Sequence, residues 1–107
     1  MLEKQILGLQ QVIETCTKVD KCFPLQYIKC LLFIYEKGGM GISELAEVSE
    51  LGISTTSRIV HSLADRRQNN TGYHFVMIVN DQNNGRKRQI FLTPKGKVFV
   101  ENLLNCF

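Results

Sequence analysis

Apolar residues recur at helical spacing through the first part of the chain. Between residues 2 and about 19 they fall alternately four and three positions apart, which predicts an amphipathic helix with a coiled-coil-like seam. A second apolar pattern begins after Pro24, a residue suited to the first position of a helix, and continues to Lys37, where Gly38 and Gly39 end it. Helices are therefore expected on both sides of Pro24.

A shorter pair of helices is predicted on either side of Gly52, which breaks the pattern between them. Ser43 is a suitable N-cap for a helix from residue 44 to about 50, and Ser54 is a suitable N-cap for a helix from residue 55 to about 67. Short helices joined by a glycine turn are typical of a helix-turn-helix.

The pattern changes to that of strands in the last third of the chain. Residues 73–79 and 89–92 are rich in β-branched and aromatic side chains, and the segment between them is turn-forming and basic, which predicts a β-hairpin. Thr93 and Pro94 then open a last helix, whose apolar face extends to residue 107. The predicted fold is mainly α with a small β-hairpin (α+β): a winged helix-turn-helix of order α-α-α-α-β-β-α, forming one domain over residues 1–107.

The net charge of +3 is distributed unevenly along the chain. Residues 1–57 carry five Lys against seven Asp and Glu, whereas residues 58–97 carry eight Lys and Arg against only two Asp. A solvated face is the plain explanation of such a run. A basic half beside an acidic half is also what a surface for binding a polyanion requires.

The second helix of a helix-turn-helix enters the major groove with its N-terminal residues at the base edges, because only that groove admits a helix. The candidate contacts on this helix are Ser54, Thr55, Thr56, Ser57, Arg58, His61 and Ser62. On the hairpin, Arg86, Lys87 and Arg88 are placed to follow the phosphates or to reach the minor groove. The alternative is that the serines and threonines only start a helix and that the arginine is a solvated charge.

Three segments of the chain resemble the MarR-like winged-helix family of bacterial regulators. SELAE at residues 43–47 is similar to the supporting helix of that family, STTSRIVHSL at 54–63 to its recognition helix, and LTPKG at 92–96 to the junction between its wing and the next helix. The resemblance implies base or phosphate contacts from residues 54–58 and a minor-groove contact from Arg86. Compact winged helices of this kind also resemble the centromere-binding proteins of plasmid and phage partition systems.

The terminal helices, at about residues 2–19 and 94–107, present apolar faces that a second copy of the chain could cover. The first helix is equally suited to covering the core of its own domain, and both roles remain open. The candidate dimer residues are Leu2, Ile6, Leu9, Ile13, Leu103, Leu104 and Phe107.

Motifs for catalysis or metal binding are absent from the sequence. Neither histidine lies in a nucleophile motif, there is no glycine-rich phosphate loop, and the four cysteines form no Cys-x-x-Cys pair. We therefore expect no enzyme activity, no cofactor and no metal. The cysteines are predicted to be buried thiols, with a redox switch at Cys22 or Cys106 as the alternative.

The function predicted from these features is sequence-specific binding of double-stranded DNA by a homodimer that regulates transcription at an inverted repeat. The alternatives are a partition protein of a plasmid or phage, and a winged helix that binds a partner protein through its seam and hairpin. The chain shows no signal-peptide pattern and no apolar stretch of about 18 residues, so a cytoplasmic protein without membrane contact is expected.

Overall fold

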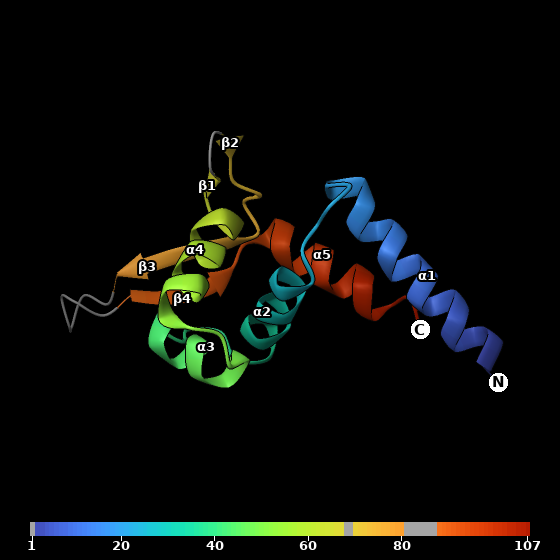
Figure 1. Ribbon diagram of the computed structural model, residues 1–107, viewed down its shortest axis with the longest axis horizontal. Coiled ribbons are helices and arrows are strands. Elements are labelled where there is room, and N and C mark those ends of the chain that lie inside the picture. The colour runs from blue at the N-terminus through green and yellow to red at the C-terminus, as the bar shows by residue number, and fades with distance from the viewer. Residues whose placement is uncertain (1, 68–69, 81–87) are drawn as a thin grey trace.

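The computed structural model describes residues 2–67, 70–80 and 88–107. Its helices are α1 (Leu2–Val19), α2 (Leu25–Glu36), α3 (Ile42–Ser49), α4 (Ile53–Leu63) and α5 (Pro94–Leu104), and its strands are β1 (Arg66–Arg67), β2 (Asn70–Thr71), β3 (Val76–Asn80) and β4 (Arg88–Leu92). Apart from the extra hairpin β1–β2, the elements follow the predicted order, and the winged helix-turn-helix is confirmed (Figure 1). None of the helices in these ranges is long and apolar enough to cross a membrane.

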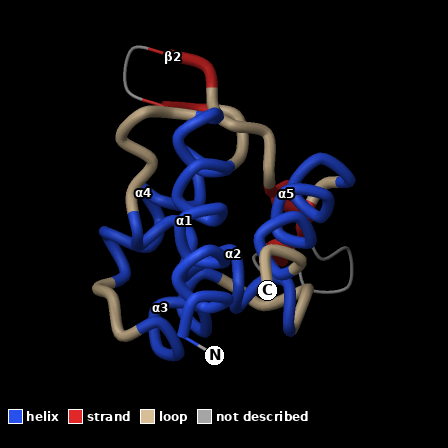
Figure 2. The backbone as a smooth tube through the Cα atoms, turned by 90° about the vertical axis from the view of Figure 1, so that its right-hand side faces the viewer, coloured by secondary structure: helices blue, strands red, loops and turns tan. Residues whose placement is uncertain are grey.

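The central helix α2 contacts α3, α4, α5 and β4. In Figure 2, α3 and α4 lie on one side of it and α5 lies on the other. Its Leu31 and Ile34 are buried together with Val60 of α4 and Val100 of α5. Because each such side chain contributes about 1.5–3 kcal/mol when it is fully buried, this packing holds α4 firmly against the rest of the molecule.

Both helices of the helix-turn-helix begin earlier than the sequence predicts. The N-caps are Gly41 and Gly52, each with extended backbone and no side-chain cap, so the predicted caps Ser43 and Ser54 are wrong. Glycine at an N-cap costs only a few tenths of a kcal/mol relative to serine, which leaves the apolar packing of the helix to decide where it begins. Ser54 is thereby released from capping and lies exposed inside the first turn of α4.

The wing is formed by β3 and β4, which pair antiparallel along their whole length. Met40 forms a bridge to Ile90, so that β4 lies between the segment at Met40 and β3. Among the described residues β3 is therefore the edge strand of the wing. It runs over residues 76–80 rather than over the predicted 73–79.

Residues 73–75, which the sequence predicts as part of a strand, bond to the end of α4 instead. The backbone N–H groups of Tyr73, His74 and Phe75 donate to the carbonyls of residues 62, 64 and 63, at the C-terminal end of α4. These bonds satisfy carbonyls that a helix end leaves without partners. These bonds also explain why α4 ends at Leu63 and not near residue 67. The short hairpin β1–β2 lies in the chain between the end of α4 and the segment at Tyr73.

The segment LTPKG joins the wing to α5 through its threonine and its glycine. The hydroxyl of Thr93 donates to the carbonyl of His74 over 2.7 Å and accepts from the backbone N–H of Gly96, which caps α5. A Cβ on Gly96 would lie 1.9 Å from the carbonyl oxygen of Phe75. The glycine therefore lets α5 pack directly on the segment that closes the end of α4.

Candidate nucleic-acid interface

The outward face of α4 carries part of the predicted recognition set. Ser54 and Arg58 are exposed and lie one turn apart, and Thr55, Ser57 and His61 are half-buried beside them. Hydroxyl groups and a guanidinium are the donors and acceptors that base edges in the major groove can match. This face therefore has the chemistry that the sequence predicts for it.

Two of the predicted contacts face the core. Thr56 is fully buried, and its hydroxyl has no hydrogen-bond partner among the described residues. Ser62 is also buried, and its backbone carbonyl accepts from the backbone N–H of Tyr73. Both residues are thereby removed from the surface open to a duplex, because the 3.6-residue turn of the helix places them on the same side as Ile59 and Leu63.

On the wing, Arg88 is exposed at the start of β4, and Arg86 and Lys87 lie outside the described residues. A groove of about 380 Å³ separates Arg88 from α4 and is lined by His61, Asp65, Ile78, Asn80 and Arg88. Helix α4 and the wing therefore border a common groove. The sequence does not indicate this groove, because its residues come from α4, the turn after α4 and both strands of the wing.

The predicted dimer residues on α1 form an exposed apolar stripe. Leu2, Ile6, Leu9 and Ile13 are between 56% and 74% exposed. At the other end of the chain, Leu104 and Phe107 are exposed, whereas Leu103 is 4% exposed and packs in the core of its own chain. The ring of Phe107 lies over Gly8, where a Cβ would come within 2.5 Å of it. The C-terminal residues thus cover the side of α1 next to the stripe.

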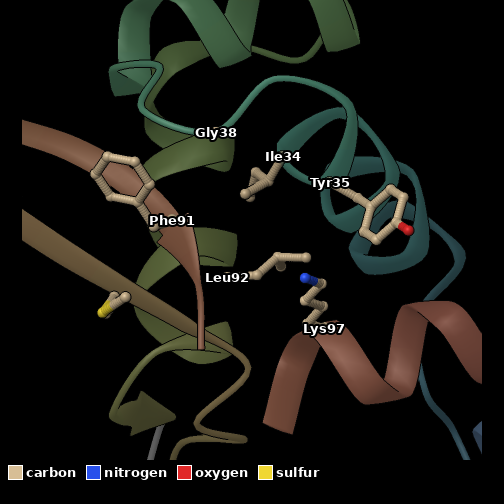
Figure 3. A pocket seen from close by; sticks show the side chains of 7 residues that line it. Ile34, Tyr35, Gly38, Phe91, Leu92 and Lys97 are labelled. Atoms are coloured by element: carbon tan, nitrogen blue, oxygen red, sulfur yellow. The ribbon is translucent and has the colours of Figure 1, made fainter. Parts of the chain in front are cut away.

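A second cavity, of about 500 Å³, lies between α2, the wing and α5 (Figure 3). Apolar and polar surfaces contribute nearly equally to its walls, and Lys97 brings an ammonium group to it. The residues that line it are Ile34, Tyr35, Gly38, Met77, Phe91, Leu92 and Lys97. The hydroxyl of Tyr35 donates to Glu101 over 3.4 Å, which connects this edge of α2 to α5.

The four cysteines differ in their surroundings. Cys16 and Cys30 are buried, as predicted, whereas Cys22 is exposed and Cys106 is half-buried. Burial raises the pKa of Cys30 to about 11. Burial also raises the pKa of Cys16, and the charge interaction with Cys106 makes a smaller contribution in the same direction. Buried thiols with a raised pKa carry little thiolate and are unreactive. Among residues 2–67, 70–80 and 88–107, no group of His, Cys, Asp and Glu is arranged to hold a metal ion.

The family model described as MarR family matches residues 24–66, which run from the start of α2 through the whole helix-turn-helix. The predicted resemblance to the MarR family is confirmed. No curated protein sequence matches the chain. The MarR match covers the face of α4 described above and stops before the wing.

Solved structures extend the likeness to the wing and the outer helices. RV1404 from Mycobacterium tuberculosis gives a TM-score of 0.75 at 18% identity over 98% of this chain and 67% of its own. MepR from S. aureus, in a complex with DNA, gives 0.76 at 18% identity over 92% of this chain and 73% of its own. A MarR family transcription regulator gives 0.70 at 14% identity over 97% of this chain and 62% of its own. These TM-scores show a shared fold. The chain spans about two thirds of the length of these similar proteins.

Proposed function

We propose that this chain binds double-stranded DNA in a sequence-specific manner and regulates transcription. The observation that carries the proposal is the outward face of α4, where Ser54 and Arg58 are exposed beside a wing that begins its second strand with Arg88. A helix with such a face fits the major groove, and an adjacent basic hairpin can follow the phosphates. The match of α2–α4 to the MarR family and the DNA-bound state of the similar MepR from S. aureus support this function.

We further propose that two copies bind an inverted repeat. The stripe of leucine and isoleucine on α1 is exposed over four residues at coiled-coil spacing, which favours pairing with an identical stripe. In such a dimer the two α4 helices enter successive major grooves, so the half-sites lie about 34–36 Å apart.

Titration of a random-sequence duplex at about 50 mM and about 200 mM salt tests the proposed binding, since phosphate contacts are lost steeply as salt rises. We expect measurable affinity at low salt and a loss of affinity at the higher concentration. Selection from a randomised duplex pool should then give a two-fold symmetric sequence. Absence of binding at both salt concentrations would contradict the proposal and favour a winged helix that binds a partner protein.

A further inference from the structure

Three of the described residues that line the groove between α4 and the wing have ionisable side chains. They are His61 of α4, Asp65 just after α4, and Arg88 of β4. Among the described residues neither Asp65 nor Arg88 forms an ion pair or a side-chain hydrogen bond with another group. Both side chains are exposed and are therefore open to a ligand in the groove.

The charge of the groove depends on His61. Among the described residues that line it, Arg88 and Asp65 compensate one another formally, so their summed charge with His61 is zero while the imidazole is neutral and positive when it is protonated. The strand β3 contributes only Ile78 and the amide of Asn80, which carry no charge. Arg58, one turn earlier on α4, is the remaining charged side chain on the same helix.

Ile78 and Asn80, which line this groove, belong to β3, the edge strand of the wing among the described residues. The N–H and C=O of Ile90 bond to Met40 and Gly39, on the side of β4 away from β3. In an antiparallel pair the residue opposite such a position also points away from its partner strand, and Ile78 is opposite Ile90. The backbone groups of Ile78, and of Asn80 two residues later, are therefore directed to the open edge.

We propose that this groove is a proton-linked phosphate site. It holds one phosphodiester of the DNA strand that passes between the recognition helix and the wing, and His61 takes up a proton when that phosphate binds. The guanidinium of Arg88 and the side-chain amide of Asn80 supply the other donors. The carboxylate of Asp65 opposes the phosphate until the imidazolium of His61 offsets the carboxylate charge. The inference rests on the proposed function, and it adds a contact that turns duplex affinity into a function of pH.

The test is the salt dependence of duplex binding at about pH 6 and about pH 8, a range in which histidine changes its charge. Each neutralised phosphate adds about 0.9 to the slope of log affinity against log salt. We expect the slope of the native protein to steepen by up to about 0.9 at the lower pH. In His61→Gln, the side chain can still form hydrogen bonds but cannot take up a proton, so the slope should not change with pH.

The second histidine of the chain provides the matched control. His74 is exposed, lies outside this groove and has a left-handed backbone with φ of 61°, which asparagine also adopts readily. His74→Asn should therefore keep the full pH effect. Asp65→Asn should raise affinity at about pH 8 roughly two- to fivefold, because it removes the opposing charge. Arg88→Gln should lower the slope at both pH values and gives a second measure of the same site.

The outcomes separate the two proposals. Binding with a slope that is independent of pH in the native protein, or an equal pH effect in His61→Gln, would overturn the phosphate site and leave the proposed function standing. No binding to any duplex at either pH would overturn both. Thermal unfolding of each variant at both pH values shows whether a change in slope comes from the groove or from loss of the fold.

Discussion

Arg58 is the exposed guanidinium on the outward face of α4, one turn after Ser54. A guanidinium in this place can pair with the two acceptors of a guanine in the major groove. We expect Arg58→Ala to weaken binding to the selected sequence by about 1–3 kcal/mol and to relax discrimination at one base pair. Fluorescence anisotropy with single-base variants of the site measures both effects. Lys29→Ala, at an exposed position of α2, is the control and should change neither. Equal losses on selected and random duplexes would contradict a base contact.

Thr56 lies on the opposite side of the same helix and buries a hydroxyl that has no hydrogen-bond partner in the part of the chain that the structure describes. An unsatisfied buried polar group costs about 1–3 kcal/mol, and valine has nearly the same shape without it. Thr56→Val should therefore raise the free energy of unfolding by about 1 kcal/mol, measured by urea denaturation. Thr56→Ser keeps the hydroxyl and loses the methyl group, so it should be less stable than the native protein. A destabilised Thr56→Val would show that the hydroxyl has a partner in solution.

At the scale of elements, α5 is held in place by the contact between Gly96 and the carbonyl of Phe75. A methyl group at Gly96 must push α5 away from the segment that closes α4, because the obstacle is backbone and cannot rotate aside. Gly96→Ala should therefore destabilise the protein by about 3 kcal/mol or more. Gly52→Ala is the matched control: its Cβ meets nothing within 4 Å, and only the capping preference of α4 is lost, at about 1 kcal/mol or less. Similar unfolding midpoints for the two variants would contradict the role given to Gly96.

The sequence predicts the order of the elements because their apolar patterns are long. Residues 2–19 and the segment after Pro24 show helical spacing over several turns, and the β-branched runs are separated by a strong turn signal. The small hairpin β1–β2 is not predicted, because strands of only two polar residues show no periodic pattern in the sequence. The extended stretch at Tyr73 looks like a strand in composition, but its backbone N–H groups bond to the end of α4.

The sequence predicts the residue types of the candidate site, but not the direction in which each side chain faces. Serines and threonines fill α4 on all sides, so only packing reveals that Ser54 faces outward and that Thr56 and Ser62 face the core. The groove of His61, Asp65 and Arg88 is absent from any local pattern, because it forms only when the wing folds beside α4. Arg88 lies 23 positions after Asp65 and 27 positions after His61 in the chain.

At the scale of the whole molecule, α1 and the wing lie at opposite ends of a long axis of 50 Å (Figure 1). The stripe on α1 is therefore well separated from the surface proposed for DNA. Association through this stripe would join two chains without covering either α4. The number of duplex contacts per complex then depends on whether α1 pairs.

Leu9→Glu tests this dependence, because a carboxylate in the middle of an apolar seam repels its copy and cannot be buried without a partner. Sedimentation should give a mass near 12.2 kDa for the variant and about twice that value for the native protein. Leu7→Glu is the matched control, since Leu7 is exposed to a similar degree, 54% against 57%, but lies on another side of α1. If dimers bind the inverted repeat, the salt slope of Leu9→Glu should fall to about half that of the control, because one chain makes half the phosphate contacts. A monomeric native protein, or a slope that Leu9→Glu leaves unchanged, would mean that one chain accounts for all of the binding and that the stripe on α1 serves another purpose.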